Sequence, residues 1–433
     1  MCKTNDESSE YDHHLQKYAR RGVNQMKLGK IGQKKYLILI LLFLAQILNF
    51  IDKTAINFAI IPISNELNLP SDKVGLVLSS FFLSYAIMQL VGGYLADKFG
   101  IKKVLSGAVF IWSAATILSG TARSYFSLLV SRFLVGVGEG AFPASAQVAI
   151  VDNFQKEVRA RAKSVISAGA SVGFMTGSIV ITLLLATFDW RFMFIILGAI
   201  GIVLAIVLWF LLKPGEKKVN NQSEQNKSID KAAIKKLLKD PLIWKLMLAA
   251  MFTNIVFWGL QSWLPSYWVK VKNMDMVSMG LYSSVPYILG FFSFLISGWI
   301  LDKFLAGYEK YMFIVGAFFS ALFIYLMFNT ESITVAFAYL ALSNVFLNAM
   351  NITVFVLPLK RIAEESVGTA TGIINTGGQI GSVLTPTIVG YLISAFNQNY
   401  NAAFMFLVAS ALVVMFVGMT IRSGNSESNS TSA

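Results

Sequence analysis

The segment Gly93-Tyr-Leu-Ala-Asp97-Lys98-Phe99 occurs a second time in the chain, 205 residues later, as Gly298-Trp-Ile-Leu-Asp302-Lys303-Phe304. Both copies lie at the end of an apolar run and precede a basic loop. A repeat of this kind indicates a chain built from two similar halves. The same shift pairs further residues, Asn49 with Asn254 and Glu139 with Asn344.

The composition indicates that most of the chain lies in lipid. The 433 residues are 55% hydrophobic and only 14% charged, whereas a soluble domain carries about 25% charged residues. Runs such as Tyr36–Ile51, Phe192–Leu212 and Ala402–Ile421 are, with their continuations, long enough to cross a hydrocarbon core of about 30 Å. We therefore predict an all-α membrane protein with about twelve spans, near 36–63, 74–96, 104–122, 125–151, 162–187, 191–212, 243–268, 277–301, 311–328, 333–357, 367–394 and 402–422.

These spans predict two six-helix bundles. The expected segments are an N-terminal tail (1–35), a first bundle (36–212), a polar linker (213–242), a second bundle (243–422) and a C-terminal tail (423–433). Two related bundles with a cavity between them are the architecture of many secondary transporters, whose substrate site lies near mid-membrane. We expect such a transporter to function as a monomer.

The basic residues are unevenly distributed between the predicted loops. Of the 36 Lys and Arg residues, 29 fall in the tails, the linker and the loops of one side, and five fall in the opposite loops. This distribution predicts that both termini are cytoplasmic and that the protein is a multi-pass protein of the cell membrane. The net charge of +13 therefore follows from topology, and we predict no nucleic-acid partner.

Other sequence features exclude several functional classes. The single cysteine, Cys2, excludes an intrachain disulfide and a multi-cysteine metal site. The first 35 residues contain no apolar run that would mark a signal peptide. No phosphate-binding loop and no nucleophile–base pair appear, so we predict neither a cofactor, nor a metal, nor an enzymatic activity.

Four ionisable residues fall inside predicted spans of the first half: Asp52, Lys53, Arg132 and Glu139. A charged residue at the centre of a membrane helix costs at least about 2.5–3.5 kcal/mol for insertion, so such residues usually have a function. Arg132 and Glu139 are two turns apart and share a helix face. We expect the helix 1 and helix 4 residues to meet across a cavity, either as a transport site or as permanent ion pairs between the helices.

The four charges sum to zero, which suggests a mechanism for coupling. If a substrate anion binds the two bases, the two acids lose their counter-ions and become easier to protonate. The loaded site would then remain close to neutral, with an anion and protons bound together.

The segment from Gly93 through Asp97 and Gly100 to Lys103 resembles the cytoplasmic loop signature of the major facilitator superfamily. In that signature, Asp97 would pair with a basic residue on a neighbouring cytoplasmic helix end and latch the outward-open state. Arg159 and Arg161 are both candidates for this partner. The alternative is a basic loop that only sets the topology.

Further segments narrow the resemblance: Phe50–Lys53, Ser131–Gly140, Arg159–Lys163 and Asp189–Arg191. They resemble the anion:cation symporter family, which includes bacterial sugar-acid:proton symporters. The resemblance implies that Asp52 and Glu139 couple protons. It also implies substrate contacts for Lys53, Arg132 and the helix 2 residue Tyr85. Bacterial sugar-acid members usually have Arg where this chain has Lys53, and a lysine lacks the bidentate fork that matches a carboxylate.

The second half offers amides and aromatic side chains in place of charges. Among them we favour Gln261, Asn375 and Gln379 as substrate contacts, because neutral donors and acceptors suit hydroxyl groups, although each could equally bond another helix. Gly169, Gly173 and Gly177 are predicted helix-packing positions.

The sequence therefore predicts proton-coupled import of a small organic anion, a sugar acid or another hydroxylated carboxylate. Three alternatives stay open: an organophosphate antiporter, a drug antiporter, and a membrane sensor that moves no solute. The helix 7 positions Asn254, Trp258 and Gln261 lack the arginine expected of the first. Gly169–Gly177 lacks the Gly-Pro pair common in the second, and the tails are short for the third.

Overall fold

The computed structural model describes residues 7–155, 158–212, 237–305 and 307–422, with side chains from Tyr36 onward except those of Asp97, Ala160, Phe291, Leu295, Glu364 and Glu365. The described residues form twelve long helices and no strand. Their bounds are α1 (Glu7–Glu66), α2 (Ser71–Phe99), α3 (Ile101–Gly120), α4 (Tyr125–Asn153), α5 (Arg159–Thr187), α6 (Trp190–Leu211), α9 (Pro241–Lys270), α10 (Met276–Lys303), α11 (Lys310–Asn329), α12 (Ile333–Arg361), α13 (Glu364–Ala395) and α14 (Tyr400–Thr420).

Polar caps and a glycine fix where several helices begin and end. Asp189, for example, accepts a hydrogen bond from the backbone of Phe192 at 2.7 Å and caps the first turn of α6. Between α2 and α3 the chain turns at Gly100, whose φ of 85° strongly favours glycine. The turn alone explains this glycine.

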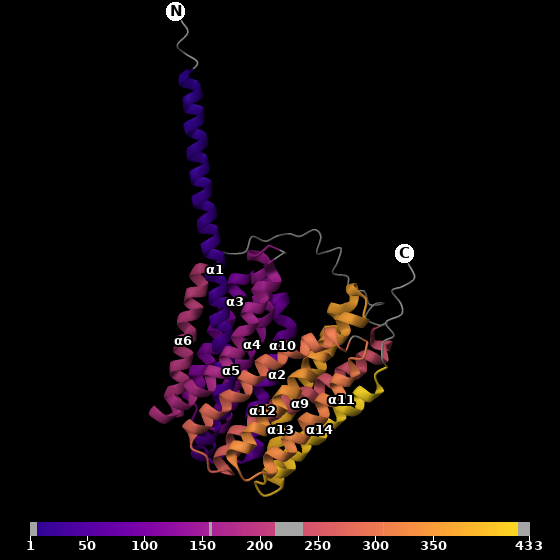
Figure 1. Cartoon of the computed structure of the whole chain (residues 1–433). Helices are drawn as coiled ribbons and strands as arrows, with labels where there is room; N and C mark the ends of the chain where they lie inside the picture. Colours follow the sequence, from indigo (N-terminus) through magenta and orange to yellow (C-terminus); the bar gives the residue numbers. More distant parts are fainter. Residues whose placement is uncertain (1–6, 156–157, 213–236, 306, 423–433) are drawn as a thin grey trace, which may run out of the picture.

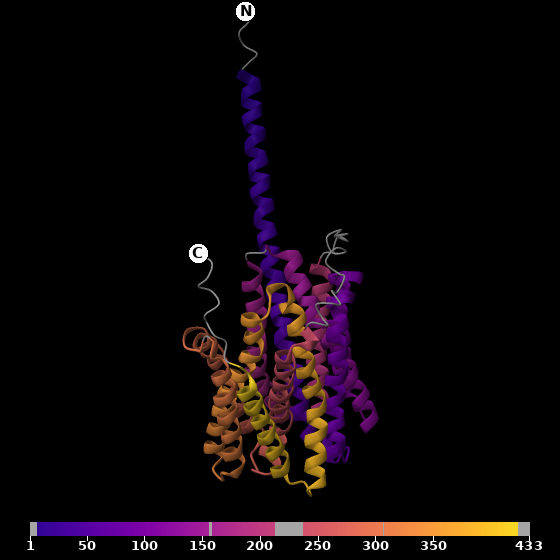
Figure 2. The same cartoon turned by 90° about the vertical axis from the view of Figure 1, so that its right-hand side faces the viewer.

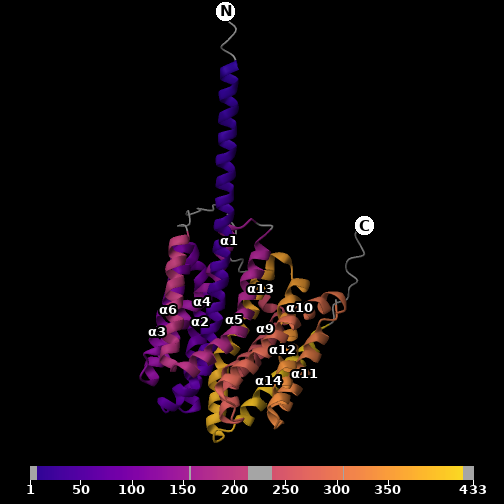
Figure 3. The same ribbon diagram turned by 60° about the vertical axis from the view of Figure 1, so that its left-hand side comes forward.

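The helices form two groups that lie side by side, α1–α6 and α9–α14 (Figures 1 and 2). The start of α1 and the end of α14 lie toward the same end of the bundle. We call that end the terminal face and the other end the opposite face. Between the groups, α2 packs on α13, α5 packs on α10 and α1 contacts α9 (Figure 3).

Eleven of the described helices are long and apolar enough to cross a membrane, and the first of these spans is Tyr36–Glu66 of α1. The twelfth long helix, α13, has 32 residues but falls outside this set because Gly, Thr, Asn and Gln interrupt its apolar residues. It packs between α2 and α9, so much of its surface faces protein. The prediction of an all-α membrane protein of about twelve helices in two bundles is confirmed.

Glycines let the helices of the first half approach closely. A Cβ on Gly173 of α5 would lie 2.7 Å from the carbonyl oxygen of Ile47 on α1, and one on Gly169 would lie 3.0 Å from that of Phe43. The predicted packing role of these α5 glycines is confirmed. Close approach of backbones is the usual way in which membrane helices associate, because lipid offers them no hydrophobic driving force.

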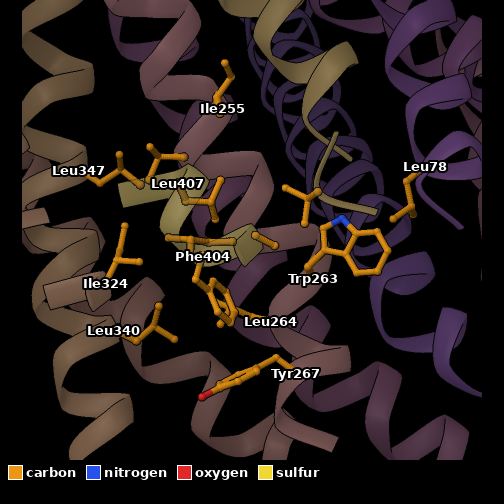
Figure 4. Close-up of a cluster of buried hydrophobic side chains, with 14 of the residues drawn as sticks. Leu78, Ile255, Trp263, Leu264, Tyr267, Ile324, Leu340, Leu347, Phe404 and Leu407 are labelled. Atoms are coloured by element: carbon orange, nitrogen blue, oxygen red, sulfur yellow. The ribbon is translucent and has the colours of Figure 1, made fainter. Parts of the chain in front are cut away.

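The second half has a large apolar core, shown in Figure 4. Phe404 and Leu407 of α14 lie there among side chains of the neighbouring helices, and Phe404 stacks on Phe328 with ring centroids 5.7 Å apart. Leu78 of α2 belongs to the same buried cluster, so the core continues into the first half.

The two halves are closely packed at the opposite face. A Cβ on Gly75 of α2 would lie only 2.5 Å from the carbonyl oxygen of Pro386 on α13. One turn away, Thr387 donates a hydrogen bond of 2.8 Å to Ser79. Near the terminal face, by contrast, a Cβ on Gly372 of α13 would meet no atom within 4 Å. The halves are therefore closely packed at the opposite face, whereas Gly372 borders open space.

Candidate functional site

Lys53 and Glu139 form a buried ion pair between α1 and α4. The Lys53 ammonium lies 3.5 Å from a carboxylate oxygen of Glu139, and their side chains are 5% and 0% exposed. Lys53 also donates a hydrogen bond of 2.8 Å to the amide oxygen of Asn49, one turn earlier on α1. The expected meeting of charged residues from helices 1 and 4 is thus present in this pair.

Aromatic rings surround the same ammonium group. Its nitrogen lies 4.4 Å from the ring centroid of Tyr85 on α2 and 4.7 Å from that of Phe50. Cation–π contacts of this kind stabilise a desolvated ammonium by about 0.5–2 kcal/mol. Tyr85, expected to contact substrate, therefore contacts the lysine through its ring.

Asp52 and Arg132 each contact a hydroxyl group of α3, a helix in which no site residue was expected. The Thr116 hydroxyl lies 3.4 Å from a carboxylate oxygen of Asp52, and Arg132 donates to the Ser119 hydroxyl at 2.8 Å and 3.3 Å. Within the described residues, no ion pair within 4.0 Å joins Asp52 to Arg132. The sequence signal for the two hydroxyl residues is their three-residue spacing, which puts both on one face of α3.

Several polar atoms of this cluster have no hydrogen-bond partner in the described structure. They are one carboxylate oxygen of Asp52, both carboxylate oxygens of Glu139 and the amide nitrogen of Asn49. Asp52 and Glu139 are 1% and 0% exposed. Most buried polar groups in proteins are hydrogen-bonded, so orphaned atoms at this density are typical of a site that binds protons, water or a ligand.

A small cavity of about 10 Å³ lies between α1, α2 and α4, and we call it the basic cavity. Lys53 and Arg132 both line it, which brings the two basic residues of the cluster to one space. Its remaining lining is mostly apolar and aromatic, with one amide; the full set is Lys53, Ile56, Asn57, Leu78, Phe81, Phe82 and Arg132.

A second pocket lies between α1 and the helices α9, α10 and α12, and we call it the amide pocket. Gln261 lines it and accepts a hydrogen bond of 2.5 Å from the hydroxyl of Tyr287. Asn344 of α12 lines it as well, and Thr54 contributes from α1. Both halves therefore contribute to this pocket, with neutral polar groups.

The other two amides expected to contact substrate lie on α13. Asn375 faces α2, where its amide nitrogen lies 3.5 Å from the amide oxygen of Gln89. Gln379 is half-buried and forms no side-chain hydrogen bond within the described residues. Neither residue lines the basic cavity or the amide pocket.

The predicted latch is described only in part. The side chain of Asp97 lies outside the described residues; Gly93 precedes it on α2, and Gly100 follows the end of that helix. Arg159, one of its two candidate partners, donates to the backbone carbonyls of Phe154 and Val151, both at 3.0 Å. The latch therefore stays a prediction.

The second copy of the motif is paired within its own half. Asp302 lies 3.0 Å from the ammonium of Lys360, at the end of α12. Nearby, Glu309 accepts a hydrogen bond of 2.9 Å from Arg361 and one of 3.0 Å from the backbone of Gly307. These contacts join α12 to the segment between α10 and α11.

Two bundles of membrane-spanning helices, with buried charges in the first and a polar pocket between the two, are typical of a membrane transport protein. The chain belongs to the major facilitator superfamily, whose family model matches residues 42–386. It is a transporter of that superfamily and not an enzyme.

Relatives agree with the resemblance to sugar-acid symporters. The chain is 31% identical to a probable sulfoacetate transporter of Cupriavidus necator, over 88% of this chain and 94% of that protein. It is 27% identical to a probable galactarate/D-glucarate transporter of Escherichia coli K12 (90% and 96%) and 26% identical to a hexuronate transporter of Bacillus subtilis (88% and 93%).

A solved structure shares the fold. It is a bacterial homolog of the human lysosomal transporter Spinster in an inward-facing, unoccupied conformation, with a TM-score of 0.76 and 22% identity. The match covers 89% of this chain and 96% of that one.

Proposed function

We propose that the protein imports a small organic anion, a sugar acid or another hydroxylated carboxylate, together with protons. Alternating access would move the substrate from the opposite face to the terminal face. The observation that carries the proposal is the ion pair of Lys53 with Glu139 in a buried site, where neither carboxylate oxygen of the acid accepts a hydrogen bond from the described residues.

This pairing supports a direct exchange of partners. A substrate carboxylate that enters the basic cavity competes with Glu139 for the ammonium of Lys53. Once it has lost its counter-ion, a carboxylate buried in a low dielectric is costly, and binding a proton removes that cost. Asp52 would act in the same way when Arg132 turns toward the substrate.

The relatives support the chemical class of the substrate. Their names refer to sulfoacetate, galactarate, D-glucarate and hexuronate, all of which are organic anions with an acidic group. Most of these carry hydroxyl groups, for which Gln261, Asn375 and Gln379 offer neutral donors and acceptors. Tyr287 holds Gln261 in place through its hydroxyl.

The distribution of basic residues supports the orientation. Lys and Arg residues concentrate in the loops of the terminal face, so we place both tails and the 213–242 linker in the cytoplasm of a cell membrane. The bundles would then be 36–212 and 243–422. In this orientation the structure is closed toward the outside, and Asp97 would form its latch in the outward-open state.

The driving force follows from the charges moved. A monoanion that enters with two protons carries one net positive charge inward, worth about 2.3 kcal/mol at 100 mV. Each unit of pH difference adds about 1.4 kcal/mol per proton.

Uptake into proteoliposomes tests the proposal. The substrate panel should contain hexonates, hexuronates, aldarates, sulfoacetate and aromatic acids, each with and without a proton gradient. Asp52→Asn and Glu139→Gln should abolish gradient-driven accumulation, whereas counterflow exchange, which needs no net proton movement, should persist. Accumulation unchanged by both substitutions would refute the coupling roles. Lys53→Arg should retain uptake if this residue binds the carboxylate.

A further inference from the structure

We propose that Asn57 is a specificity-determining residue that recognises a hydroxyl group on the carbon next to the substrate carboxylate. This inference rests on the proposed function, because it concerns the substrate of the same site. It makes 2-hydroxycarboxylates the preferred substrate class.

Asn57 shares the basic cavity with both bases. It lies one helical turn after Lys53 on α1, and the side chains of residues four apart lie on the same helix face. Both line the cavity, into which Arg132 projects from α4. A group bound by the two bases would therefore lie within reach of the Asn57 amide.

The Asn57 amide has no partner in the protein. The residue is 6% exposed, yet its side chain forms no hydrogen bond within the described part of the chain. Other asparagines on membrane helices satisfy themselves locally: Asn254 donates to the carbonyl of Ala250 at 3.0 Å, and Asn344 donates to that of Leu340 at 3.0 Å. Neither amide atom of Asn57 belongs to the fully buried polar atoms that lack a partner among the described residues, so the amide reaches open space beside the cavity and is available to a ligand.

The chemistry of the cavity gives this amide a distinct task. Lysine and arginine side chains only donate hydrogen bonds, whereas an asparagine amide both donates and accepts. The other cavity-lining residues, such as Phe81, Phe82 and Leu78, have apolar side chains. Among the lining side chains, Asn57 therefore supplies the acceptor that a hydroxyl proton needs. A carboxylate on the bases and a hydroxyl on the amide fit a 2-hydroxy acid, in which the two groups are on adjacent carbons.

The test compares pairs of acids that differ only at carbon 2, one with the hydroxyl and one without it. In proteoliposomes, the wild-type protein should take up the hydroxy acid with a KM at least about tenfold lower than that of the deoxy acid, since sites built to bond a hydroxyl reject analogues that lack it. Asn57→Leu should reduce this ratio to about twofold or less, mainly through KM. Asn57→Ser, which keeps a donor and an acceptor, should retain most of it.

Asn254→Leu is the control, because it removes an amide of the second half that already bonds the backbone of its own helix, and it should leave the ratio unchanged. An unchanged ratio in Asn57→Leu, or a wild-type protein that transports both acids of each pair equally, overturns the inference while leaving anion import intact. If Asn57→Leu does not fold, Asn57→Ser is the deciding variant. Equal KM values of this variant for the hydroxy acid and the deoxy acid would refute the role of Asn57. Absence of uptake of every organic anion by the wild-type protein refutes the proposed function itself.

Discussion

The two halves of the molecule share a backbone plan but differ in what they bury at matching positions. Lys53 in the first half corresponds to Trp258 in the second, and Glu139 corresponds to Asn344. The charged pair lies 3.5 Å apart between α1 and α4. Its neutral counterparts serve other contacts: Trp258 packs on Phe82 with ring centroids 4.7 Å apart, and Asn344 bonds its own helix.

This difference indicates that the two halves serve different parts of the substrate. Buried charges are expensive in a membrane and are retained where a function requires them. The first half therefore holds the groups suited to an acidic head and to protons, while the second half offers amides and aromatic rings suited to the rest of a substrate. The similarity of the two halves lies in helix packing, and their chemistry has diverged.

The largest effect is expected when the charge is removed from the first half. Lys53→Met leaves Glu139 without its counter-ion and the basic cavity with one base, so uptake should fall by about 100-fold or more. Trp258→Phe, at the matching position of the second half, should change uptake by only a few fold. Initial rates of uptake into proteoliposomes, normalised to the amount of folded protein, measure both.

Comparable losses in the two variants would contradict the division between the halves. Lys53→Met combined with Glu139→Gln provides the control for folding, because this pair removes both members of the buried Lys53–Glu139 ion pair. The double variant should recover the thermal stability that Lys53→Met loses and should remain inactive.

Much of the fold could be predicted from the sequence, because lipid imposes strong constraints. A span needs about twenty apolar residues with their backbone groups bonded internally, and this requirement makes helices visible in composition alone. The repeat of Gly93–Phe99 as Gly298–Phe304 then indicates two halves. The span predicted at 367–394 corresponds to α13, although polar residues interrupt its apolar run and the helix packs between α2 and α9.

For the candidate site, the sequence predicts which charged residues are buried but not which partners they contact. Charges inside apolar runs mark Asp52, Lys53, Arg132 and Glu139, but the spacing of residues along a helix does not show how neighbouring helices are rotated. Lys53 meets Glu139, whereas Arg132 bonds a hydroxyl of α3. That partner, like Asn57, is a small polar residue of a type common in membrane helices, and only its place in the packed bundle distinguishes it.

A second comparison concerns the two ends of the contact between α2 and α13, and its expected effect is intermediate. Gly75→Leu would force a side chain against the backbone of Pro386, so the opposite face should no longer close. We expect about a tenfold loss of uptake and a shift toward the state open at that face. Gly372→Leu meets no atom within 4 Å in this state and should leave the closed opposite face unchanged.

Labelling of single cysteines introduced near Gly75 reports on this equilibrium, with Cys2 replaced by serine in every variant. Gly75→Leu should raise the labelling rate at the opposite face, and Gly372→Leu should not. Equal labelling of the two variants would show that the tight α2–α13 contact does not control closure.

The smallest expected effect concerns the terminal face of the second half, where Glu309 lies between α10 and α11. Burial tends to raise the pKa of this carboxyl, but hydrogen bonds from the Gly307 backbone and from Arg361 outweigh burial, so its pKa lies below the ordinary value of 4.5. A group whose pKa is lowered by folding stabilises the folded state above its unfolded pKa, and this contribution is lost as the pH falls through the folded pKa.

Thermal unfolding in detergent between about pH 6 and about pH 3 should therefore show a decrease in Tm toward acid that Glu309→Gln reduces by about 1–2 °C. Because the substitution keeps the shape of the side chain but cannot ionise, its effect should appear at the upper end of this range and vanish at the lower end. Glu331→Gln, an exposed site before α12, should not alter the profile. A pH profile for Glu309→Gln parallel to that of the wild type would show that the contact with Arg361 does not stabilise this end of the bundle.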